Sequence, residues 1–126
     1  MNENWVEIKS GFMNNNEKAQ VLENILKHGY QIYYYRENGA DEFCLYAYEK
    51  DKEISRFSFY ENDTCLNDNN IWTHEDYRKR GIGSCLCVLA EFICNGKKIV
   101  NCWQEEQSND AKKFWAQKNR QFGENI

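Results

Sequence analysis

One stretch of this chain constrains its fold more than any other, because cations, glycines and a long apolar run follow one another there. The cations of 78–80 lead directly into two glycines, Gly81 and Gly83, and apolar residues then recur at helical spacing over 82–93. That recurrence predicts a helix, and the preceding residues 70–74 are typical of a strand. A strand, a basic glycine loop and a helix N-terminus together predict an anion site. Glycines allow close backbone approach there, and the first helical N–H groups have no internal partner. The expected ligand is a pyrophosphate carried by a nucleotide or coenzyme.

The spacing of the two glycines excludes two common nucleotide-binding loops. The dinucleotide pattern GxGxxG needs a third glycine, whereas Gly83 is followed by Ser-Cys-Leu. The P-loop pattern closes on Gly-Lys-Ser/Thr, and the loop has no such ending. The pattern that remains is Tyr-Arg-x-x-Gly-x-Gly over residues 77–83.

This pattern resembles the coenzyme-A loop of the GNAT acetyltransferase superfamily. The resemblance extends from Ile71 through the loop and the following helix to Cys94. Residues 109–115, Asn-Asp-Ala-Lys-Lys-Phe-Trp, look like that family's second cofactor segment, with Asn109 and Phe114 among the matching residues. The resemblance implies an acetyltransferase that moves an acetyl group from acetyl-coenzyme A directly to a primary amine, on a small molecule or a peptide.

The same resemblance implies which residues bind coenzyme A. Backbone N–H groups of 80–84 would cradle the pyrophosphate, and the neighbouring cations would add positive charge. The edge of the preceding strand, at Trp72 and Thr73, would hold the pantetheine arm through backbone hydrogen bonds. The implied cofactor-binding residues are Trp72, Thr73, Arg78, Lys79, Arg80, Gly81, Ile82, Gly83, Ser84, Asn109 and Phe114.

The residues for the catalytic step depart from the family pattern. Trp115 stands where the family frequently has a general-acid tyrosine, and an indole N–H is not acidic enough to protonate a thiolate. His74 or Glu75, at the end of the strand facing the cofactor, is the expected general base, because one of them must take a proton from the attacking ammonium. The sequence offers five alternative acids without ranking them: Tyr33, Tyr34, Tyr35, Tyr60 and Tyr77.

Trp115 therefore leaves other interpretations open. The rival from another class is a catalytically silent coenzyme-A-binding sensor or interaction module of the same fold. A third interpretation is a phosphate-loop protein for a different nucleotide. The family's Gly-Phe is also absent after Trp115. We therefore expect a truncated C-terminal end, and a homodimer in which a partner completes the sheet is a hypothesis.

The composition narrows the class of protein. With 126 residues, 41% of them hydrophobic, the chain can bury a core, and we expect one domain over 1–126. No apolar run reaches the roughly 18 residues of a membrane span, and the first four residues do not resemble a signal peptide. A cytoplasmic protein without membrane contact is therefore expected. The net charge of −4 argues against nucleic acid as a partner.

Cysteine spacing and charge distribution add two further expectations. The six cysteines form no Cys-x-x-Cys, so we expect small buried hydrophobes and no metal site. Residues 1–70 carry 13 acidic and 7 basic side chains, and residues 71–126 carry 7 acidic and 9 basic ones. The basic half suits a polyphosphate cofactor and the acidic half suits an amine acceptor, although surface solubility explains the asymmetry equally well.

Periodicity and turn residues predict an α/β (α+β) fold with a GNAT-like order of elements. A mixed, mostly antiparallel sheet is expected, flanked by helices and splayed where coenzyme A inserts. The stretch 61–69 is polar and is expected to be a turn. The predicted strands are 5–9, 31–35, 42–49, 54–60, 70–74 and 97–103, and the predicted helices are about 17–28, 82–93 and 111–118.

Overall fold

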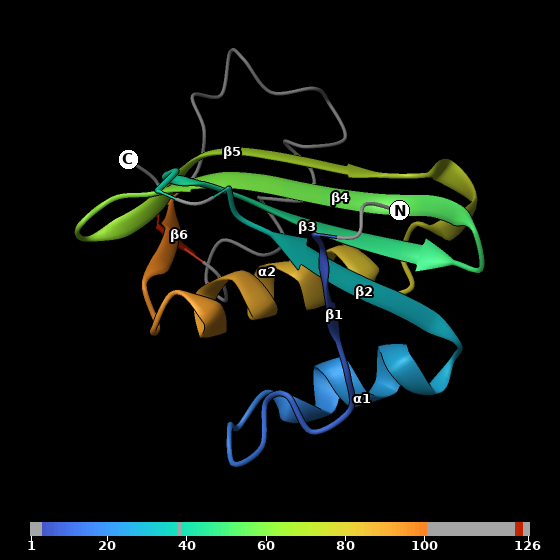
Figure 1. Ribbon diagram of the computed structural model, residues 1–126. Helices are drawn as coiled ribbons and strands as arrows, with labels where there is room; N and C mark the ends of the chain where they lie inside the picture. Colours follow the sequence, from blue (N-terminus) through green and yellow to red (C-terminus); the bar gives the residue numbers. More distant parts are fainter. Residues whose placement is uncertain (1–3, 38, 101–122, 125–126) are drawn as a thin grey trace.

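The protein folds as a mixed α+β structure in which one sheet carries two helices on the same face (Figure 1). The computed structural model describes residues 4–37, 39–100 and 123–124. The helices are α1 (Ala19–Lys27) and α2 (Ile82–Ile93), with a 3-10 turn, η1 (Glu75–Tyr77), between sheet and α2. The strands are β1 (Val6–Ile8), β2 (Tyr30–Tyr35), β3 (Glu42–Glu49), β4 (Lys52–Glu61), β5 (Cys65–Thr73), β6 (Lys98–Val100) and β7 (Gly123–Glu124).

The sheet is mostly antiparallel, as the sequence predicts. Its seven strands lie in sequence order, β1-β2-β3-β4-β5-β6-β7. Each neighbouring pair from β1 to β5 is antiparallel, whereas β5–β6 and β6–β7 are parallel. The parallel β5–β6 pair is joined through α2, because parallel neighbours need a crossover connection. This crossover places α2 beneath the centre of the sheet.

Helix α2 has the bounds that the sequence predicts and forms the centre of the core. Nine of its 12 residues are buried, which agrees with an apolar pattern that covers most of its circumference. The helix ends in a Schellman motif, in which Gly96 N–H donates to Glu91 O (2.7 Å) and Asn95 N–H donates to Phe92 O (3.2 Å). The sequence Asn95-Gly96 directly after the apolar run predicts a helix C-cap, and both residues have the positive φ that such a cap requires.

Helix α1 packs beside α2 through an apolar face that includes the buried Leu22 and Ile25. The sequence Asn-Asn-Asn at 14–16 predicts a cap for this helix, and the structure places that cap just outside it. Asn16 Oδ1 accepts the N–H of Lys18 (2.9 Å), while the N-cap residue Lys18 makes no side-chain cap hydrogen bond. Gly29, at φ +91°, ends the helix as expected and turns the chain into β2.

Strand β5 begins at Cys65, so the prediction of a turn over 61–69 is wrong for its second half. The polar composition of this segment conceals one apolar anchor, Leu66, which is fully buried. The regular alternation of a strand is also broken there. Ser58 pairs with Asn70 and Tyr60 pairs with Asn67, so two residues of β5 face one residue of β4. This β-bulge places one extra residue in β5 and changes its side-chain alternation.

A second bulge changes the face of Ile54. The register of β3 and β4 shifts between Ala47 and Tyr48, and Ile54 is the extra residue of β4. The sequence predicts Ile54 on the same face as Tyr60, opposite Phe57. In the structure Ile54 is fully buried in the core, whereas Tyr60 is 42% exposed, so this pairing of faces is wrong.

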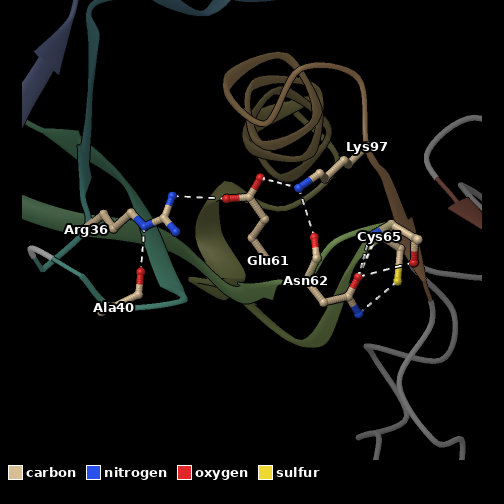
Figure 2. A network of polar contacts seen from close by, with 7 residues as sticks. Arg36, Ala40, Glu61, Asn62, Cys65 and Lys97 are labelled. Carbon is tan, nitrogen blue, oxygen red and sulfur yellow. Dashed lines mark hydrogen bonds and ion pairs between the residues drawn. The ribbon is translucent and has the colours of Figure 1, made fainter.

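An ion-pair network holds the end of β4 to two distant segments (Figure 2). Glu61 accepts from Arg36 Nη1 (3.0 Å) and from Lys97 Nζ (2.8 Å), and its own side chain is only 16% exposed. Lys97 Nζ also donates to the backbone oxygen of Asn62 (2.9 Å). Arg36 follows β2 and Lys97 precedes β6, so one carboxylate links the β2–β3 connection, the β4–β5 hairpin and the α2–β6 connection.

We predict that Glu61→Gln destabilises the fold in a pH-dependent way. The hydrogen bonds and charges of Lys97, and then Arg36, lower the pKa of Glu61 below its ordinary value near 4.5. A lowered pKa stabilises the fold above the unfolded pKa, and this stabilisation is lost as pH falls through the folded pKa. Urea unfolding at pH 7 should give a loss of about 1–2 kcal/mol for the variant, and the difference should shrink toward pH 3. A matched control is Glu7→Gln, because Glu7 pairs with the 74% exposed Lys9 and its loss should change stability by about 0.5 kcal/mol or less. An equal loss at both pH values would contradict the assignment.

Candidate functional site

The basic glycine loop connects η1 to the N-terminus of α2 and is exposed from Arg78 to Gly81. Arg78 is extended, with φ −71° and ψ 156°. Lys79 and Gly81 have left-handed backbone conformations, with φ of 64° and 82°. The left-handed region is uncommon for a residue with a side chain, and left-handed residues are the building blocks of backbone nests that bind anions. The loop therefore has the backbone form of an anion site as well as the composition of one.

The first turn of α2 presents its backbone N–H groups next to this loop. The first hydrogen bond of the helix runs from Cys85 N–H to Gly81 O (3.0 Å), so the N–H groups of 82–84 precede it. The N-cap residue Gly81 has no side chain that could cap these N–H groups. A Cβ added to Gly81 would meet no atom within 4 Å, so the space beside the loop is open. This combination of uncapped N–H groups and positive helix dipole can bind a phosphate or pyrophosphate.

Arg80 is held by one side chain from the distant strand β2 and by one from the adjacent turn η1. Its Nη1 donates to the hydroxyl of Tyr30 at the start of β2 (3.0 Å), and its guanidinium lies 5.0 Å from the ring centre of Tyr77. Tyr77 in turn donates its hydroxyl to Glu49 at the end of β3 (2.7 Å), and Lys52 Nζ lies 5.4 Å from the same ring centre. The bond to Glu49 raises the pKa of Tyr77. The sequence pattern gives no sign of Tyr30 or Glu49, because both are far from the loop in the chain.

The backbone of β5 presents alternate peptide groups at the edge that faces β6. His74 N–H donates to Ile54 O (2.8 Å), so the register makes Ser55 and Thr73 a non-hydrogen-bonded pair. Their hydroxyls are accordingly close, at 2.9 Å. The peptide groups of Thr73 and Ile71 then point away from β4. Arg78 Nε uses one of them, because it donates to Thr73 O (3.1 Å) and ties the loop to the strand.

The two residues expected to hold pantetheine thus differ in backbone direction. Thr73 and its neighbour Ile71 direct N–H and C=O toward the β6 edge, whereas Trp72 directs its own toward β4. The carbonyl of Trp72 also accepts the hydroxyl of Ser55 (2.9 Å). Among the described strands, β6 pairs with β5 only at Cys65 and Leu66. The side chain of Trp72 is 44% exposed.

His74 and Glu75 lie together where β5 passes into η1. His74 is the N-cap residue of that turn, and its Nδ1 accepts the N–H of Asp76 (3.2 Å). An imidazole that accepts at Nδ1 in its neutral form carries its proton on Nε2. His74 therefore has no basic lone pair at Nε2 while it caps the turn. Glu75 is exposed, so its carboxylate is accessible to a substrate.

Burial makes one of the alternative acids a poorer proton donor and two thiols of the described chain poor nucleophiles. Burial raises the pKa of Tyr33, and burial raises the pKa of Cys85 and Cys94 to about 12. A thiol with a raised pKa is a weak nucleophile at neutral pH. Within 4–37, 39–100 and 123–124, no three His, Cys, Asp or Glu side chains gather as a metal site. No helix in the same ranges is long and apolar enough to cross a bilayer.

Three of the residues that the resemblance selects fall outside the part of the chain that the structure describes. These are Asn109, Phe114 and Trp115, together with the helix predicted over 111–118. The candidate site in the described chain consists of the loop, the first turn of α2, the open edge of β5 and the residues at its end.

Three comparisons with known proteins identified no relative of this chain. A scan against protein-family models, a search of curated proteins and a search of solved structures each gave no match. The functional argument therefore depends on the geometry of the loop, the helix and the strand edge.

Proposed function

We propose that this protein is a GNAT-like N-acetyltransferase that takes an acetyl group from acetyl-coenzyme A and moves it directly to a primary amine. The observation that carries this proposal is the exposed loop at 78–81. It joins two left-handed residues to the uncapped first turn of a buried 12-residue helix. That arrangement binds phosphates through backbone N–H groups, and its Tyr-Arg-x-x-Gly-x-Gly sequence resembles a coenzyme-A loop.

The chain offers groups that fit each part of coenzyme A. The N–H groups of 82–84 and the cations Arg78, Lys79 and Arg80 suit the pyrophosphate. The outward peptide groups of Ile71 and the outward N–H of Thr73 suit the amide-bearing pantetheine arm, which an extended strand edge can bind by backbone hydrogen bonds. When bound, acetyl-coenzyme A supplies an acyl group activated as a thioester.

The residues of the chain then have two tasks, orientation and proton removal. A direct transfer depends mainly on holding the amine and the thioester in line. Proton removal from the attacking ammonium needs a base at the end of β5, and Glu75 suits this role better than His74. Glu75 is an exposed carboxylate, whereas His74 uses Nδ1 to cap η1 and carries its proton on Nε2. The proposed location is the cytoplasm, where acyl donors of this kind are used.

A second candidate function is a coenzyme-A-binding module without acetyl transfer. The observation that favours it is the hydrogen bond from Asp76 N–H to His74 Nδ1. This bond occupies one of the two expected bases, so proton removal would depend on Glu75 alone. Both functions share the cofactor site, so binding and turnover have to be measured separately.

We predict that Gly81→Ala weakens coenzyme-A binding at least about tenfold. The added methyl group meets no atom within 4 Å, but φ of +82° is strained for alanine and shifts the loop. Gly39→Ala is a matched control, because Gly39 has φ of +79° and open space but lies in the β2–β3 connection. Both variants should lose about 1 kcal/mol of stability, and only Gly81→Ala should lose affinity in titration calorimetry. Unchanged affinity of Gly81→Ala would remove the loop from the cofactor site, and a thermal shift with another nucleotide in place of coenzyme A would contradict the proposed ligand.

We predict that Glu75→Gln lowers the rate of thiol release from acetyl-coenzyme A about 100-fold or more at neutral pH, with an unchanged Kd for coenzyme A. His74→Asn should lower that rate less than about tenfold, because asparagine is a good N-cap residue and keeps the turn. The assay uses polyamines, aminoglycosides and lysine peptides as acceptors. The reverse order of the two effects would assign the base to His74. Tight coenzyme binding without thiol release on any of these amines would favour the silent module.

A further inference from the structure

A second candidate site lies at the opposite end of α2 from the glycine loop. A cavity of about 690 Å³ opens there between the segment 12–18, strand β2 and the C-terminal half of α2. This volume is in the range of small-molecule sites. Its lining includes three aromatic rings, one buried carboxylate and two lysines: Phe12, Tyr34, Phe92, Glu91, Lys18 and Lys98.

The apolar wall of this cavity is held in place. The ring of Phe12 meets Phe92 edge-on, with ring centres 5.5 Å apart, and lies 6.4 Å from Tyr34. The turn that carries Phe12 is anchored to α1, because Glu23 accepts both the N–H of Gly11 (3.0 Å) and the hydroxyl of Ser10 (2.5 Å). The next residue in the chain, Met13, is only 1% exposed. The aromatic wall is therefore formed before any ligand arrives.

Glu91 is the unusual polar group of the cavity. The residue is 6% exposed, and its Oε2 accepts the N–H of Ile99 in β6 (3.1 Å). Its Oε1 lies 3.5 Å from Lys98 Nζ, but the Lys98 side chain is 61% exposed and keeps its ammonium largely in water. Burial raises the pKa of Glu91, while Ile99 N–H, Lys98 and Lys18 lower it in part. A carboxylate with one close donor retains acceptor capacity for a further N–H group.

The charges of the cavity are arranged by depth. The carboxylate of Glu91 is nearly buried, whereas Lys98 is exposed and Lys18 is half-buried. The exposed Glu17 also lines the cavity, so the three outer side chains together carry one net positive charge. A ligand that fits must place a cation inward, an anion outward and an apolar body against the rings. A ligand with only a negative charge would be repelled by Glu91, and a ligand with only a positive charge would be repelled by both lysines. Each would therefore find a complementary charge at one end of the cavity only.

We propose that this cavity binds a small zwitterion with an apolar side chain, such as a free aromatic or large aliphatic α-amino acid. The ammonium group donates to Glu91, the carboxylate faces Lys98 and Lys18, and the side chain packs against Phe12 and Phe92. Charge-assisted hydrogen bonds are strongest where the partners are withdrawn from water, and ring faces also attract an ammonium group. This site is independent of the proposed acetyltransferase function, since it lies at the other end of α2.

Three related probes test the charge pattern in the full-length chain. L-phenylalanine carries both charges, phenethylamine carries the cation alone and 3-phenylpropionate carries the anion alone. Titration by calorimetry or by protein-observed NMR should give L-phenylalanine at least a tenfold lower Kd than either analogue. Equal affinities for the three probes would overturn the proposal. So would the absence of detectable binding of L-phenylalanine at millimolar concentration.

Two variants assign the charges to residues. Glu91→Gln keeps an acceptor for Ile99 N–H and should weaken L-phenylalanine and phenethylamine at least tenfold while sparing 3-phenylpropionate. Lys98→Gln changes a side chain that is 61% exposed, and should weaken L-phenylalanine and 3-phenylpropionate while sparing phenethylamine. Lys27→Gln, on the exposed end of α1, is the matched control and should change none of the three. Should Glu91→Gln fail to fold, Lys98→Gln decides the question, and an unchanged affinity for L-phenylalanine in that variant would contradict the site.

Discussion

Burial of α2 beneath the sheet is the contact on which the rest of the structure depends. Most of this helix is withdrawn from water, and it touches β3, β4, β5 and β6 as well as α1. Each Å² of apolar surface buried contributes about 25 cal/mol, so this helix contributes strongly to the stability of the core. Because the helix is rigid, its position also fixes both ends. The glycine loop is thereby held at the end of β5. The cavity between the segment 12–18, β2 and α2 is formed at the other end of the helix, near the start of β6.

The sequence predicts α2 to the residue because three independent local signals agree there. Apolar residues recur with the helical period, a glycine precedes the helix and an Asn-Gly pair follows it. The first half of β5 is missed because its signals conflict. Its asparagines are typical of turns, and the bulge opposite Phe59 removes the alternation that identifies a strand. This segment forms a strand because it pairs with β4 and β6, and the local sequence does not reveal these pairings.

The candidate site divides in the same way. The loop is predictable, since its glycines and cations are adjacent in the chain. The partners that hold it are not, because Tyr30 lies 50 residues before Arg80 and Glu49 lies 28 residues before Tyr77. The role of His74 as a helix cap likewise depends on the φ and ψ of the turn that follows it. Composition gives the chemistry of such a site, and long-range pairing decides which side chains remain available for a substrate.

The edge that β5 presents toward β6 consists of backbone N–H and C=O groups, so it depends little on the identity of the side chains. Outward peptide groups recur at every second residue, about 7 Å apart, whatever side chains the strand carries. Substitutions at Ile71 or Thr73, whose side chains lie on one face of the sheet, can therefore change that face and leave the hydrogen-bonding pattern of the edge intact. Proline is the exception, since it removes the N–H group that the edge offers. The hydrogen-bonding pattern of the edge at 71–73 is thus insensitive to every residue type but proline.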